Sequence, residues 1–70
     1  MDFSQALVQL KADHEIMRVG WHKSNMKIAI HDMQLGYKEF PVFTIEINGE
    51  FFQWHPSPTD LLAEDWEVVK

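Results

Sequence analysis

The chain has 70 residues and a formal net charge of −5 at pH 7, and 46% of its residues are hydrophobic. This length allows a single small domain over residues 1–70; such domains bury only about 60% of the surface exposed on unfolding, and many are stabilised by self-association. The acidic balance argues against general nucleic-acid binding, which depends on basic surface. Because there is no cysteine, disulfides and thiolate metal sites are excluded.

The sequence also indicates where the protein functions. No apolar run approaches the roughly 18 residues of a membrane-spanning helix. The first residues lack the basic and then apolar pattern of a secretory signal peptide. We therefore expect a cytoplasmic protein without a membrane partner, and the absence of cysteine suits that reducing compartment.

The first expected element is a helix over roughly residues 3–12. Asp2 and Gln5 have the spacing of a capping box, in which each side chain accepts a hydrogen bond from the backbone N–H of the other residue. Apolar residues then recur at helical spacing, namely Phe3, Ala6, Leu7 and Leu10. These two signals together predict an amphipathic helix.

Two short strands are expected next, over residues 15–19 and 26–30; in the second, Met26, Ile28 and Ile30 alternate with Lys27 and Ala29. Ile16 is the expected inward-facing residue of the first strand. Between the strands, Gly20 stands directly before Trp21, a combination that favours a bulge or a close approach of the backbone. We therefore predict a sharp turn at this glycine.

The middle of the chain is expected to be a loop. Residues 31–39 contain several polar side chains and Gly36, and they show no clear period. Pro41 has no backbone N–H to donate, so it fits the start of a strand or an edge position.

A β-hairpin is predicted over residues 42–54. Asn48-Gly49 is the strongest short hairpin signal, because a type I′ turn needs positive φ at both central residues. A two-residue turn at this point fixes the cross-strand pairs, which are Ile47 with Glu50, Ile45 with Phe52, and Phe43 with Trp54.

The C-terminal segment is expected to contain a short helical turn and a last strand. The prolines of residues 55–58 cannot continue the preceding strand. Thr59 can cap a turn that runs through Ala63, and residues 66–69 have strand character. The predicted fold class is α+β, with one N-terminal helix packed on a four- to five-stranded, mostly antiparallel sheet.

Three segments resemble one known family. They are the capped helix from Asp2 to Ala12, the turn Arg18-Val19-Gly20-Trp21 followed by Met26, and the run WHPSPTDLLAEDWEV from Trp54 to Val68. Together they are similar to the second Thoeris anti-defense family, a group of small phage and prophage domains. The C-terminal run is the most specific of the three.

The resemblance implies a non-enzymatic sponge in the cytoplasm of the infected host. Members of the family assemble as oligomers, so a homo-oligomer such as a dimer or tetramer is implied. They bind cyclic ADP-ribose isomers made by immune enzymes, and some hold cyclic oligonucleotides. A relative acts as an anti-CRISPR protein, so the alternative is a protein–protein inhibitor of a bacterial immune effector.

A small anionic ligand of this kind needs an apolar face for its base, donors for its phosphates and polar groups for its ribose. Residues 18–27 contain three Lys or Arg residues and no carboxylate, which suits an anion. The candidate ligand-binding residues are Arg18, Trp21, Asn25, Met26, Trp54, Ser57, Thr59 and Asp60. Lys23 and Lys27 are further candidates to donate hydrogen bonds to a phosphate.

Each candidate has an ordinary structural alternative. Tryptophans commonly pack in the core, as we expect for Trp66. The cations can be plain surface residues, Asn25 can be a left-handed turn residue, and Ser57 or Thr59 can be a simple helix cap.

Metal binding and catalysis are not expected. The histidines have no paired spacing on one element; they are His14, His22, His31 and His55. No Gly-x-Ser-x-Gly elbow, phosphate loop or dinucleotide fingerprint is present. The sequence therefore predicts no metal site, no cofactor and no catalytic residue.

Overall fold

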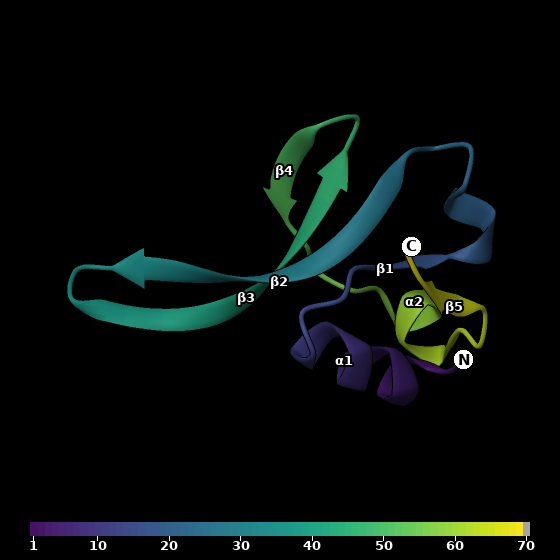
Figure 1. The fold of residues 1–70 in the computed structure, drawn as a ribbon, viewed down its shortest axis with the longest axis horizontal. Coiled ribbons are helices and arrows are strands. Elements are labelled where there is room, and N and C mark those ends of the chain that lie inside the picture. The colour runs from purple at the N-terminus through teal and green to yellow at the C-terminus, as the bar shows by residue number, and fades with distance from the viewer. Residues whose placement is uncertain (70) are drawn as a thin grey trace.

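The computed structural model describes residues 1–69. It contains a five-stranded antiparallel sheet in the order β4-β3-β2-β1-β5 and two α-helices, which confirms the predicted α+β class (Figure 1). The elements are α1 (Phe3–Lys11), β1 (Ile16–Arg18), the 3₁₀ helix η1 (Val19–Trp21), β2 (Met26–Leu35), β3 (Lys38–Ile47), β4 (Glu50–Gln53), α2 (Pro58–Leu62) and β5 (Trp66–Val68).

Helix α1 begins as the sequence predicts. Asp2 caps it, the backbone N–H of Gln5 donates to the Asp2 carboxylate at 2.8 Å, and the Gln5 side chain accepts from the Asp2 N–H at 3.0 Å. Such a box satisfies two amides that the first turn leaves free. Ala6 and Leu10 of this helix are buried against the sheet.

The core is small and largely aromatic. Its buried residues are Ala6, Leu10, Ile16, Ile28, Trp54 and Trp66. The ring centroid of Phe3 lies 6.1 Å from that of Trp54 and 5.6 Å from that of Trp66. Edge-to-face and tilted aromatic pairs at such distances add about 0.5–1.5 kcal/mol each beyond area burial, so these rings provide much of the packing energy.

The two ends of the described chain meet at β5. The Met1 ammonium donates to the carbonyl oxygens of Glu64 at 3.2 Å and Trp66 at 2.9 Å, and the Trp66 N–H donates to the Met1 carbonyl at 3.1 Å. Strand β5 pairs with β1 in the register Ile16 with Val68. The predicted last strand is thereby confirmed, and it is one of the two edge strands of the sheet.

The hairpin of β3 and β4 has the predicted register. Ile47 pairs with Glu50 and Ile45 with Phe52, and the Trp54 N–H donates to the Phe43 carbonyl at 2.9 Å. Asn48 and Gly49 have φ values of 51° and 87°. Positive φ at both positions is what a type I′ turn requires, so local chemistry determines this element.

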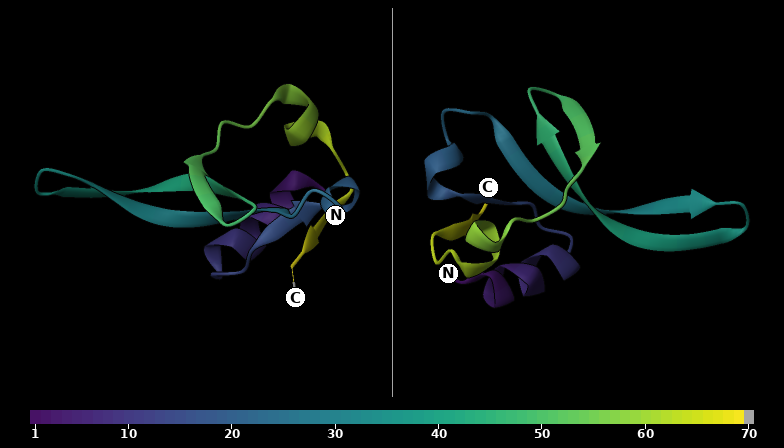
Figure 2. Two further views of the ribbon diagram at one scale, coloured as in Figure 1. Left: turned by 90° about the horizontal axis from the view of Figure 1, so that it is seen from above. Right: turned by 180° about the vertical axis from the view of Figure 1, so that it is seen from behind.

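The prediction of a loop over residues 31–39 is wrong. Strand β2 continues to Leu35, and β3 begins at Lys38 after a two-residue turn whose first residue, Gly36, has φ of 65°. The ends of these strands, residues 31–42, form a hairpin that we call the arm; it projects away from both helices (Figures 1 and 2). Residues 31–41 are all exposed, so neither face meets the core and the strands lack the strong apolar signal of a buried strand.

Two local predictions also need correction, and one is confirmed. Gly20 leads into the expected sharp turn through η1, but no atom lies within 4 Å of where its Cβ would be, so there is no close backbone approach. Ser57, not Thr59, caps α2. Pro41 is not at the start of β3, but it has the expected edge position, because β3 pairs there with β2 and has not yet reached β4.

Helix α1 offers a matched test of the core. Leu10 is 1% exposed and Val8 is 63% exposed. We expect Leu10→Ala to reduce the free energy of unfolding by about 2–5 kcal/mol because it leaves a cavity, out of a total of roughly 4–10 kcal/mol for a domain of this size. Val8→Ala should change it by less than about 0.5 kcal/mol. Urea denaturation measures both, and equal losses would contradict the position assigned to α1.

Candidate functional site

Arg18 joins three segments that are distant in the sequence. Its Nε donates to Asp65 at 2.9 Å and its Nη1 donates to Asp60 at 3.3 Å. All three side chains are partly exposed at the edge where β1, α2 and β5 meet. The guanidinium therefore already has two carboxylate partners, and in this arrangement it positions α2 against the sheet.

The charges of this group alter each other's titration. The hydrogen bond from Arg18 lowers the pKa of Asp65 below its ordinary value of 3.8, and burial opposes the shift. The hydrogen bond to Asp65 raises the pKa of Arg18 above its ordinary value, again against burial. The two groups stay ionised together through the neutral range, so the pair persists there.

Helix α2 is held in place by its cap and by Trp66. Ser57 and Asp60 form a reciprocal capping box, with the Asp60 N–H donating to the Ser57 hydroxyl at 3.2 Å. The Trp66 indole N–H donates to the Asp60 carbonyl at 3.0 Å. Thr59 lies exposed on the outside of this helix. Ser57 and Asp60 thus already have hydrogen-bond partners within the fold, as they would if their role were to cap the helix.

Trp21 and Trp54 differ in accessibility. Trp54 is 8% exposed and belongs to the core, with its ring 6.0 Å from that of Trp66. Trp21 is partly exposed at the end of η1, and its ring lies 5.4 Å from that of Trp66 at an interplanar angle of 83°. Of these two stacking candidates, Trp21 is the more accessible to solvent.

The turn after Trp21 carries two more candidates. Asn25 is exposed and has φ of 50°, and its carbonyl accepts from the Asn48 N–H at 3.3 Å. This bond attaches the turn to the tip of the β3–β4 hairpin. Met26 opens β2 opposite Ile47 and is partly buried.

The two lysines have different surroundings. Lys27 lies between Glu15 and Glu46, with Nζ–oxygen separations of 3.8 and 3.7 Å. It is on the face of the sheet opposite the aromatic core, because its neighbour Ile28 points into that core. Lys23 is exposed in the turn and takes part in none of the ion pairs within residues 1–69. Lys23 is therefore the cation of this stretch that is available to an anion.

The structure thus divides the eight candidates. It brings Arg18, Ser57, Asp60 and the two tryptophans around Trp66. It places Asn25 in the adjoining turn and Met26 at the start of β2, and leaves Thr59 on the surface. No single pocket among the described residues contains all eight, and their role in ligand binding stays a prediction.

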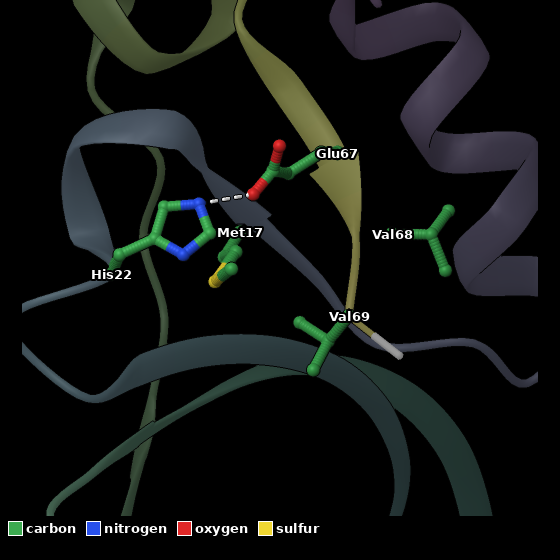
Figure 3. A pocket seen from close by; sticks show the side chains of 5 residues that line it. All are labelled: Met17, His22, Glu67, Val68 and Val69. Atoms are coloured by element: carbon green, nitrogen blue, oxygen red, sulfur yellow. Dashed lines mark ion pairs between the residues drawn. The ribbon is translucent and has the colours of Figure 1, made fainter.

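A shallow cavity of about 350 Å³ lies elsewhere, and the sequence reasoning missed it (Figure 3). It is lined by Met17, His22, Glu67, Val68 and Val69. His22 Nε2 and Glu67, which are in contact there, form an ion pair when the imidazole is protonated; they are too far apart in the sequence to signal the cavity. The volume is at the lower end for ligand pockets, and the Glu67 carboxylate would repel phosphate.

Comparison with known proteins assigns a family. Residues 1–69 match the model of the Thoeris anti-defense 2-like domain. A curated relative, Thoeris anti-defense 2 of Bacillus phage SP01, is 34% identical over 84 residues, covering 99% of this chain and 94% of the relative. The chain belongs to the Thoeris anti-defense 2-like family. The resemblance seen in the sequence is confirmed, and phage anti-defense is its general function.

The match to the Thoeris anti-defense 2-like domain spans the arm as well as the site. Within residues 1–69, no helix is long and apolar enough to cross a membrane. In the same part of the chain, no three His, Cys, Asp or Glu side chains gather as they would around a metal ion.

The Arg18–Asp65 pair predicts a pH dependence of stability. The pKa of Asp65 is lower in the folded protein than its ordinary value. At a pH above the ordinary value, the ionised carboxylate therefore stabilises the folded state, and this stabilisation is lost as the pH falls through the lowered pKa. We expect the melting temperature of the native protein to fall more steeply below about pH 4 than that of Asp65→Asn. Glu64→Gln, which alters an exposed neighbouring carboxylate, is the control. Parallel curves for all three proteins would show that the pair contributes nothing.

Proposed function

We propose that this protein is a phage anti-defense sponge that binds a cyclic ADP-ribose isomer, or a related cyclic nucleotide, and sequesters it without cleaving it in the host cytoplasm. Membership of the Thoeris anti-defense 2-like family supports the anti-defense role. Sequestration requires tight stoichiometric binding and no catalytic group, which fits a chain whose sequence offers no catalytic motif.

The observation that carries the proposal is the partial exposure of Trp21. Trp66 supports this ring edge to face at 5.4 Å, and η1 places it at the start of an exposed turn. A supported aromatic ring with free surface can stack on an adenine, and such stacking contributes about 1–3 kcal/mol per base. Trp21 therefore supplies the base-binding element.

The turn that follows supplies polar contacts. Lys23 can bind a phosphate, since its ammonium has no carboxylate partner among the ion pairs of residues 1–69. The backbone of Asn25 is held by the hydrogen bond from Asn48, and its exposed side chain can bind the base or ribose from that position. Met26 adds apolar surface beside them.

The remaining candidates have supporting roles in this proposal. Arg18 orients α2 and would have to leave Asp60 and Asp65 to bind phosphate. The Asp60 carboxylate repels an anion, so Ser57, Thr59 and Asp60 are better suited to ribose hydroxyls. Trp54 supports the core beneath Trp66.

A thermal-shift screen with mass spectrometry tests the function. At a ligand concentration 100-fold above Kd, binding stabilises the fold by about 2.7 kcal/mol, which corresponds to a rise in melting temperature of roughly 10 °C or more for a domain of this size. We expect that rise with a cyclic ADP-ribose isomer, and the intact ligand should be recovered after denaturation. A cleaved product would make the protein an enzyme. No shift with any cyclic nucleotide would favour an inhibitor that binds an immune effector protein.

Paired variants test the site. Trp21→Leu keeps apolar bulk against Trp66 but removes the stacking surface, so affinity should fall roughly 5- to 150-fold. Trp21→Phe keeps an aromatic ring and should lose much less. Lys23→Ala should weaken binding and reduce its salt dependence, whereas Lys11→Ala, on an exposed position of α1, should have no effect. Unchanged affinity in Trp21→Leu would place the ligand elsewhere.

A further inference from the structure

Two consecutive residues at the end of η1 contact two consecutive residues of β5. The ring of Trp21 lies 5.4 Å from that of Trp66. Next to it, Nε2 of His22 contacts the Glu67 carboxylate (Figure 3). Successive side chains of a strand point to opposite faces, and Trp66 is buried in the core, so Glu67 lies on the other face of the sheet. The end of η1 thus holds β5 from both faces, and we call these two contacts the clamp.

The backbone of the turn from η1 to β2 is attached to the rest of the fold at its two ends. At the first end, the Val19 N–H donates to the Asp65 carbonyl at 3.0 Å. At the other end, the Asn25 carbonyl accepts from the Asn48 N–H at 3.3 Å. Within residues 1–69, no side chain caps η1 with a hydrogen bond. Between the two ends, the position of Trp21 therefore depends on the side-chain contacts of the clamp.

Open space beside His22 makes its polar contact important. The imidazole borders the cavity of about 350 Å³, whose walls include Met17 and Val69 (Figure 3), and the His22 side chain is 56% exposed. A side chain with empty space beside it has fewer van der Waals contacts to hold it. The contact with Glu67 is therefore what fixes the orientation of this imidazole.

The contact does not require a charged imidazole. An ionised carboxylate can only accept hydrogen bonds, and the donor can be a protonated imidazole or a neutral one that carries its proton on Nε2. Hydrogen bonds to an ionised group are stronger than those between neutral groups. Glu67 can therefore orient His22 in both states, and His22 is bonded directly to Trp21 along the chain.

We propose that His22 and Glu67 are positioning residues that hold the Trp21 ring in the orientation in which it stacks on a base. This role rests on the proposed sequestering function. When the pair is broken, the turn samples other positions, and only a fraction of the molecules has the ring in place. The apparent affinity falls by that fraction, although neither of the two side chains has to touch the ligand.

Binding kinetics test the role with the cyclic ADP-ribose isomer that gives the largest shift in the thermal screen. His22→Ala and Glu67→Ala should each weaken binding about 2- to 12-fold, which is the range for ordering one side chain. The association rate should fall and the dissociation rate should stay the same, because only the population of competent molecules changes. The double variant should bind no more weakly than the single ones, since all remove the same contact.

Two further variants separate positioning from other effects. His14→Ala removes another exposed histidine and should change neither rate. His22→Gln keeps a side-chain N–H that can donate to Glu67, so it should recover much of the affinity that His22→Ala loses. Circular dichroism establishes that each variant folds.

Three kinetic results would overturn the proposal. Unchanged affinity in His22→Ala would mean that Trp21 is positioned without the pair. Faster dissociation would mean that the imidazole contacts the ligand itself, because lost contacts act mostly on the dissociation rate. An equal loss in His22→Gln and His22→Ala would mean that the hydrogen bond is not what matters.

Fluorine NMR tests the clamp without any ligand. The chain has three tryptophans; incorporated as fluorotryptophan they report separately, and Trp21→Phe identifies the resonance of Trp21. His22→Ala should shift or broaden that resonance and leave the resonance of Trp54, deep in the core, in place. An unmoved Trp21 resonance would overturn the proposed positioning. A native protein that binds no cyclic nucleotide would instead overturn the sequestering function, so the two failures are distinguishable.

Discussion

The fold depends on the position of one side chain, Trp66. Its ring packs on the rings of Phe3, Trp21 and Trp54, and its indole N–H holds the Asp60 carbonyl of α2. Its backbone binds Met1 in both directions. A single residue thus joins both helices, the turn after β1 and the start of the chain. With so small a core, no other contact replaces this one.

This dependence links stability to function. The ring proposed to stack on the ligand rests on Trp66, and the helix that carries Thr59 and Asp60, and that Ser57 caps, is held by Trp66 and Arg18. Binding energy is used efficiently when the contacting groups are already in place. The same aromatic contacts that stabilise the domain therefore also fix the geometry of its binding surface.

Local chemistry explains which parts were predictable from the sequence. The capping box of Asp2 and Gln5 and the Asn48-Gly49 turn depend on neighbouring residues, and both were predicted correctly. The arm was missed because a ribbon without a core face has a weak hydrophobic pattern. The carboxylate partners of Arg18 stand 42 and 47 residues away in the sequence. The sequence therefore could not show that its guanidinium is already paired with carboxylates and is not free to donate hydrogen bonds to a phosphate.

The contact between Met1 and Trp66 spans 65 positions of the sequence, and this has a consequence for how the protein folds. Closing so long a loop costs conformational entropy before any packing energy is gained. During synthesis, the aromatic cluster cannot assemble until Trp66 has left the ribosome, although α1 and the β3–β4 hairpin can form earlier. Folding is therefore concentrated in one late, cooperative step, in which the last strand completes a core prepared by the first helix.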